Sequence, residues 1–218
     1  MKIYTVYHIL IYTSIASGLI PLWYSFVNYK SFNKQMKALF IYLVISVLTD
    51  AGSRILNMTE YKSSVLELYF SFSVFDFFFI SYIYWLEFRK KSYRIMISFL
   101  CLIYVIGIFI PFLQHKKIDA IDSIISVIEA IIIILLSIIF LFKTTLDLEI
   151  PKPKDYPFFW LNSAFLFYFG TNFFMLLFNN TLKEFDHTIV YYIISIRPVT
   201  NIAYNLLIAK AVCKIKKI

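Results

Sequence analysis

Long apolar stretches separated by short polar segments run from one end of the chain to the other. A membrane-spanning helix needs about 20 mostly apolar residues, because every backbone polar group must be satisfied within the segment itself. Seven segments meet this requirement, over residues 5–27, 38–56, 65–86, 95–113, 121–142, 158–178 and 188–209. The pattern therefore predicts an all-α fold, a seven-helix transmembrane bundle that forms one domain over residues 1–218.

The composition strengthens this prediction. Of the 218 residues, 61% are hydrophobic and 16% are charged, and the mean hydropathy is +0.76. A soluble domain is about half apolar and about a quarter charged. The composition thus excludes an ordinary soluble globule and predicts an integral membrane protein whose first partner is the lipid bilayer.

The basic residues are distributed unequally between the two sets of loops. Fourteen of the 21 Lys and Arg lie after the first, third, fifth and seventh segments, whereas five lie on the opposite side. Cytoplasmic loops carry the excess of Lys and Arg. This predicts an amino terminus outside and a carboxyl terminus in the cytoplasm. It also accounts for the net charge of +8 without nucleic acid, which is not an expected partner.

A faint internal repeat joins the second and sixth segments. Thr49-Asp50 is followed by six residues and then Asn57, and Thr171-Asn172 is followed by six residues and then Asn179. If this is more than coincidence, the first three segments correspond to the last three, and the fourth is a linker. The fourth segment carries few polar residues beyond Ser98 and Tyr104, so we expect it to face lipid.

Ionisable residues inside the predicted spans need an explanation, because each costs about 2.5 to 3.5 kcal/mol at the centre of a spanning helix. Six stand out, namely Asp50, Arg54, Glu67, Asp76, Glu129 and Arg197. With the predicted orientation, Asp76 lies near the middle of its helix and the others lie in the outer half. The charged groups are therefore expected near the outer side of the membrane.

These charges lie on polar stripes, because residues three, four and seven positions apart share one face of a helix. Stripes on five helices favour a shared polar pocket that opens outward. Its predicted ligand-binding residues are Asp50, Arg54, Asp76, Glu129, Asn172, Arg197 and Asn201. With Glu67 counted as well, four acids against two arginines favour a small cation or a proton as the ligand.

Structural interpretations stay open beside this one. Asp50 and Arg54 are four residues apart and could be only an ion pair. Glu67 lies close enough to the outer surface to be solvated. The three histidines lie far apart, so no metal site is predicted, and neither a catalytic motif nor a cofactor signature is found.

Several short sequences resemble an uncharacterised family of small bacterial seven-helix integral membrane proteins. They are Gly18-Leu19-Ile20-Pro21-Leu22, residues 39–50 with Ser46, Leu66-Glu67, and Pro157-Phe158-Phe159-Trp160-Leu161-Asn162-Ser163. Members of that family are often encoded beside sensor histidine kinases. The resemblance therefore implies the bacterial inner membrane and a cytoplasmic signalling partner, and it carries no catalytic residue with it.

The leading hypothesis is a sensor or receptor-like module that binds a small ligand or a proton in the outward-facing pocket and signals to a cytoplasmic partner. A small-solute transporter of three-plus-one-plus-three type is the first alternative, but it would need polar lining in the inner half, for which only Ser137, Asn162 and Glu87 are candidates. An intramembrane lipid-modifying enzyme using Asp76, Glu129 and Asn172 is another. A structural or pore-forming subunit of a larger complex is the last.

Overall fold

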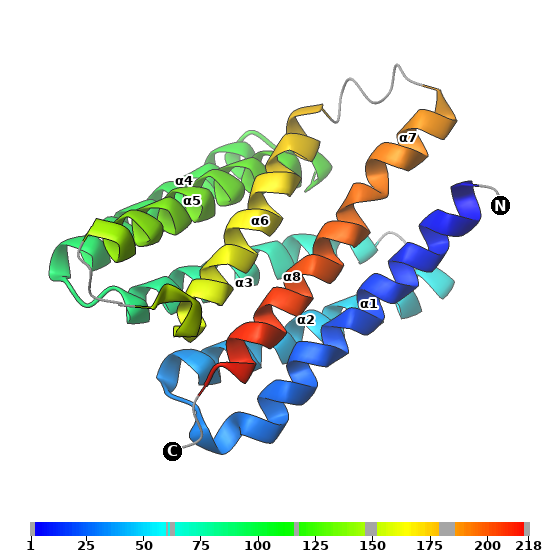
Figure 1. Cartoon of the computed structure of the whole chain (residues 1–218). Helices are drawn as coiled ribbons and strands as arrows, with labels where there is room; N and C mark the ends of the chain where they lie inside the picture. Colours follow the sequence, from blue (N-terminus) through cyan, green and yellow to red (C-terminus); the bar gives the residue numbers. More distant parts are fainter. Residues whose placement is uncertain are drawn as a thin grey trace. The chain divides into compact units, whose positions relative to one another are not determined.

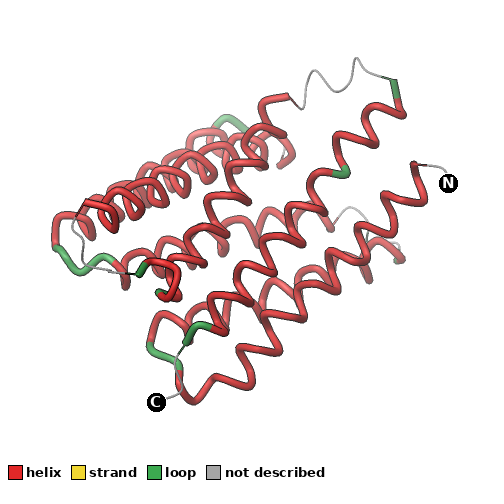
Figure 2. Tube along the Cα trace, in the orientation of Figure 1, coloured by secondary structure: helices red, strands yellow, loops and turns green. Residues whose placement is uncertain are grey.

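The computed structural model describes residues 3–59, 61, 64–115, 118–146, 152–178 and 186–215. Figure 2 shows that this part of the chain is helical almost throughout, and it contains no strand. The all-α prediction is therefore confirmed for the described residues.

Each of the seven predicted segments coincides with helical structure, with boundaries within a few residues of those predicted (Figure 1). The α-helices are α1 (Ile3–Asn28), α2 (Lys34–Met58), α3 (Ser64–Glu87), α4 (Lys91–Leu113), α5 (Ile118–Leu146), α6 (Pro157–Phe178), α7 (His187–Ile194) and α8 (Ile196–Cys213). Two short 3₁₀ turns, η1 (Tyr29–Ser31) and η2 (Pro153–Asp155), precede α2 and α6. The seventh predicted segment is divided into α7 and α8 by the single residue Ser195.

Five helices are long and apolar enough to cross a membrane: α1 extended by η1, α2, α3, α4 and the main part of α5. Among the described residues, α6 and the α7–α8 segment fall outside this group. With eight residues, α7 is too short to span by itself. Spanning by these two segments stays a prediction.

The chain forms two compact units, which we describe separately. The central unit comprises residues 32–133, and the terminal unit comprises residues 1–31 with 134–218. The boundary falls within α5, between Ile133 and Ile134. The single domain over residues 1–218 and the correspondence between the first three and last three helices both stay predictions.

In the central unit, α3 packs against both α2 and α4. The rings of Phe77 and Tyr104 stack with their centroids 3.7 Å apart, and both residues are completely buried. Only Ile97, Tyr104 and Pro111, spaced seven residues apart, are buried on α4. Most of α4 is thus exposed, as the sequence suggested, but Tyr104 faces the interior instead of lipid.

In the terminal unit, α8 lies between α1 and α6 (Figure 1). Ser14 and Ser17 of α1 accept hydrogen bonds from Asn201 and Asn205 of α8, each at 2.8 Å. Because the two pairs advance together along both helices, α1 and α8 run parallel. Small residues at such an interface allow the two backbones to approach closely.

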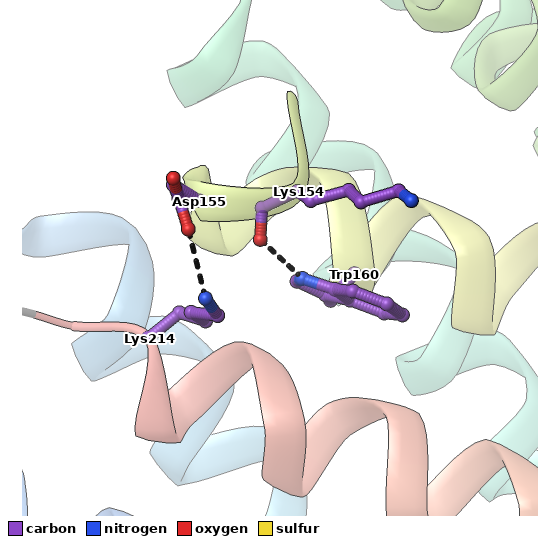
Figure 3. Close-up of polar contacts among 4 residues, drawn as sticks. All are labelled: Lys154, Asp155, Trp160 and Lys214. Carbon is purple, nitrogen blue, oxygen red and sulfur yellow. Dashed lines mark hydrogen bonds and ion pairs between the residues drawn. The ribbon is translucent and has the colours of Figure 1, made fainter. Parts of the chain in front are cut away.

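Within the terminal unit, loops that the sequence assigned to one side of the membrane lie together. Figure 3 shows Lys214, just after α8, contacting Asp155 of η2 at 2.9 Å. Next to it, the indole nitrogen of Trp160 donates to the carbonyl oxygen of Lys154 at 2.8 Å. The ammonium group of Lys210 lies 3.6 Å from the centre of the Trp160 ring. The carboxyl end of α8 and the start of α6 thus form one basic, aromatic end of the unit.

The central unit has a comparable end. The Gln35 amide of α2 donates to the carbonyl oxygen of Ile83 and to the carboxylate of Glu87. The guanidinium of Arg94 lies 4.2 Å from the centre of the Trp85 ring and donates to the backbone at Trp85 and Phe88. Tryptophan and basic residues are typical of the membrane–water interface.

Candidate functional site

Two predicted acids, Asp76 of α3 and Glu129 of α5, form a buried carboxyl pair in the central unit. Asp76 is 8% exposed and Glu129 is 4% exposed. Ser73 lies one turn before Asp76, and its hydroxyl donates to Oε2 of Glu129 at 2.7 Å. The two carboxyl groups also act on each other electrostatically. The structure therefore brings these two predicted residues together.

Tyrosines from two further helices complete the surroundings of the pair. The Tyr42 side chain of α2 hydrogen-bonds the Asp76 carboxyl group. The Tyr104 hydroxyl of α4 donates to the carbonyl oxygen of Ser73 at 3.5 Å, at the upper limit for such a bond. All four helices that contribute to the central unit thus supply a group to this cluster.

One oxygen of each carboxyl group is left without a hydrogen bond. Within the described residues, Oδ1 of Asp76 and Oε1 of Glu129 are buried and accept no hydrogen bond. Buried polar atoms are usually paired, and each exception calls for an explanation. The described groups that act on these carboxyls are Tyr42, Ser73, Asp122 and each other, and none of them is a cation.

The chemistry of this cluster suits a small cation. Two carboxyl oxygens lie within a buried site, and the Ser73 and Tyr42 hydroxyl oxygens could add to them. Oxygen ligands suit hard cations, and a proton would equally remove the repulsion between two carboxylates. In the described part of the chain, no set of three or more His, Cys, Asp or Glu side chains is placed to hold a metal ion.

Asp50 and Arg54 of α2 form a separate polar group of the central unit. Both are half-buried, and the Arg54 charge acts on the Asp50 carboxyl group. Beside them, the hydroxyl of Ser53 donates to the carbonyl oxygen of Asp50 at 2.9 Å and accepts from the hydroxyl of Tyr69 at 3.0 Å. This arrangement supports the structural interpretation, in which one turn of α2 carries its own neutralising pair.

The other three predicted residues meet in the terminal unit. Asn172 of α6 and Arg197 and Asn201 of α8 line a hollow of about 250 Å³. Ser14 of α1, Tyr168 of α6 and Pro198 of α8 complete the lining. The predicted residues thus form two groups in the central unit, Asp76 with Glu129 and Asp50 with Arg54, and a third group in the terminal unit.

A local feature of the sequence brings Arg197 to this hollow. Pro198 has no backbone N–H, so it cannot donate to the carbonyl of Ile194, four residues earlier. The helix is interrupted at Ser195, whose hydroxyl and amide both donate to the carbonyl oxygen of Tyr191. Arg197 therefore lies in the first turn of α8, at the break.

Several residues of the carboxyl cluster and of the hollow were not predicted from the sequence. Tyr42 and Tyr104 contact the carboxyl cluster, and Ser14 and Tyr168 line the hollow. The buried residues of α4, Ile97, Tyr104 and Pro111, are seven residues apart, but α4 is apolar all round, so this spacing does not stand out in the sequence.

Comparisons with protein-family models, curated proteins and solved structures each found no match. The resemblance to a bacterial seven-helix family therefore stays a prediction that depends on the short sequences named above.

Proposed function

We propose that this chain is a multi-pass protein of the bacterial inner membrane that senses a small cation, either a proton or a monovalent metal ion, at Asp76 and Glu129. One observation carries the proposal: each of these buried carboxyl groups has an oxygen without a hydrogen bond, and no described cation acts on the pair. The hydroxyl groups of Ser73 and Tyr42 supply only part of the hydrogen bonding that two buried carboxylates require.

Binding would change the relative stability of different helix arrangements. Without a cation, two adjacent carboxylates repel each other and favour any state in which α3 and α5 separate them. A bound cation or proton favours the state in which they are adjacent. A ligand shifts such an equilibrium by its difference in affinity for the two states. The cluster is therefore suited to convert ion binding into a change of helix packing.

The proposed output is cytoplasmic. The excess of Lys and Arg predicts that the basic ends of both units face the cytoplasm, with the amino terminus outside. The family resemblance implies a cytoplasmic signalling partner, because members of that family are often encoded beside sensor histidine kinases. A change in the packing of α3 would reach the turn between α3 and α4, where Arg94 is anchored on Trp85.

A transporter is the second candidate, because the α7–α8 segment is interrupted beside a polar hollow. Interrupted helices line the substrate sites of many transporters, which are often built from repeats such as the three-plus-one-plus-three arrangement. The candidates for polar lining in the inner half are already bonded, however. Gln35 donates to Glu87, and Asn162 donates to the carbonyl oxygen of Ser137. Uptake of radioactive sodium into proteoliposomes would favour the transporter over the sensor.

The sensor proposal is tested by following thermal unfolding of the purified chain during cation titration. Sodium replaces choline at constant ionic strength, and the titration is repeated at a series of pH values. Binding to the folded state alone adds about 2.7 kcal/mol at a ligand concentration 100 times the dissociation constant. We expect the wild-type protein to be stabilised by sodium or by protons, and we expect Asp76→Asn and Glu129→Gln to abolish that response.

The matched control is Glu67→Gln, which removes an exposed carboxylate from the same helix as Asp76. This variant should respond as the wild type does. If Asp76→Asn and Glu129→Gln, both folded by circular dichroism, keep the wild-type dependence on sodium and pH, the carboxyl pair is not the sensing site.

A further inference from the structure

The hollow of the terminal unit has a charge opposite to that of the carboxyl cluster. Arg197 is the only charged residue among its six lining residues. A guanidinium group stays protonated inside proteins. The charges of all the predicted residues together favour a cationic ligand, whereas this hollow on its own carries a positive charge.

Its polar groups present hydrogen-bond donors. Asn201 gives one amide hydrogen to the hydroxyl of Ser14 at 2.8 Å, and Asn172 gives one to the carbonyl oxygen of Tyr168 at 2.9 Å. Each amide has a second N–H, and the Ser14 hydroxyl has its own hydrogen. Together with the guanidinium, these groups can surround a single negatively charged group.

The geometry points to a small carboxylic acid as the ligand of this hollow, and we propose that Arg197 binds its carboxylate. The planar guanidinium group matches a carboxylate with two parallel hydrogen bonds. The volume of about 250 Å³ lies just below the range of about 300 to 1,000 Å³ of drug-sized ligand sites, which favours an acid of few carbon atoms.

This site does not depend on the proposed cation site. Asp76 and Glu129 belong to the central unit, whereas every lining residue of the hollow belongs to the terminal unit. The two proposals can therefore fail separately, and variants of one site serve as controls for the other.

The test measures binding by isothermal titration calorimetry to the full-length chain in nanodiscs of phosphatidylcholine. The probes are acetate, lactate and succinate, with chloride as the reference anion. We expect saturable binding of at least one of the three acids. Loss of a charge-assisted bidentate contact should weaken that binding by about tenfold to a hundredfold in Arg197→Gln. Arg197→Lys keeps the positive charge but lacks the two parallel donors of the guanidinium group, so it should bind with intermediate affinity.

Two control variants sharpen the test. Arg89→Gln removes an exposed arginine of the central unit and should bind the acid as the wild type does. Glu129→Gln should also leave acid binding unchanged, even where it abolishes the response to cations.

Three outcomes would overturn the proposal. In the first, none of the three acids binds to the wild type. In the second, Arg197→Gln binds them as tightly as the wild type. In the third, the acids fail to bind but phosphatidylglycerol added to the nanodiscs stabilises the wild type and not Arg197→Gln, which would assign the hollow to a lipid phosphate group.

Discussion

Ser73 connects the two halves of the proposed cation site. The Ser73 hydroxyl donates a hydrogen bond to Oε2 of Glu129. Ser73 itself lies one turn from Asp76, on the same face of α3. Oε1 of Glu129 has no hydrogen bond, so Ser73 is the hydrogen-bond partner of this carboxyl group among the described side chains. Ser73 therefore determines how α3 holds the Glu129 side chain.

Replacing Ser73 with alanine should destabilise the protein through Glu129. The change would leave a second buried carboxyl oxygen without a partner, which costs about 1 to 3 kcal/mol. Reversible unfolding in mixed micelles measures this loss. Ser71→Ala is the matched control, because Ser71 is exposed and bonds only its own helix at Glu67. Equal stability of the two variants would contradict the role assigned to Ser73.

Asp76 and Glu129 could be recognised in the sequence because a charge within an apolar stretch is costly and therefore conspicuous. The neutral residues that contact them could not be recognised in this way. The chain has 17 tyrosines, and nothing in the sequence distinguishes Tyr42 from those that lie at the surface. The burial of Tyr104 follows from its stacking on Phe77, a contact between two helices that no local pattern records.

At the scale of elements, the contact between α1 and α8 depends on small side chains. The buried residues of α1 are Ser14, Ser17, Pro21 and Ser25, which form one face. Two of these serines receive hydrogen bonds from asparagines of α8. Close approach of the helices and bonding between their polar groups therefore occur at the same residues.

Ser17→Leu should separate these two helices. The larger side chain overpacks a buried position, which costs about 1 to 3 kcal/mol, and it also removes the acceptor of the Asn205 amide. Ala16→Leu places the same side chain at the adjacent exposed position and should be tolerated. Thermal unfolding in micelles distinguishes the two variants, and a midpoint for Ser17→Leu as high as that for Ala16→Leu would contradict the proposed packing.

The position of every helix could be predicted from hydropathy, but the interruption between α7 and α8 could not be placed. Pro198 removes one backbone donor and so favours a kink near its own position. The break itself falls at Ser195, where the side chain bonds the preceding turn at Tyr191. A hydrogen bond from a serine side chain to the backbone of the preceding turn can disturb a helix, and the hydropathy of the sequence does not reveal such a bond.

At the scale of the whole molecule, the sequence predicted that polar stripes from five helices form one pocket. Periodicity shows which residues share a face of one helix, but it does not show which faces meet. The structure gathers the acids Asp76 and Glu129 in the central unit and Asn172, Arg197 and Asn201 in the terminal unit. Within its own unit each cluster has a charge of its own, acidic at Asp76 and Glu129 and basic at Arg197, and this grouping could not be predicted from periodicity.

The orientation in the membrane is predicted by the basic residues and can be tested at Cys213. This exposed cysteine ends α8, beside Lys210 and Lys214. In a Cys101→Ser background, a membrane-impermeant maleimide should label Cys213 in inside-out vesicles and leave it unlabelled in right-side-out vesicles. Labelling from the outside alone would reverse the proposed orientation.

The central claim, that Asp76 and Glu129 bind a small cation inside the protein, is tested most directly by carbodiimide labelling followed by peptide mapping. Hydrophobic carbodiimides react with carboxyl groups in apolar surroundings, and a bound metal ion protects its ligands. We predict that dicyclohexylcarbodiimide modifies Glu129 or Asp76, and that either sodium or a rise in pH suppresses this modification while choline does not. Modification of neither residue, or modification that is insensitive to both sodium and pH, would contradict the account.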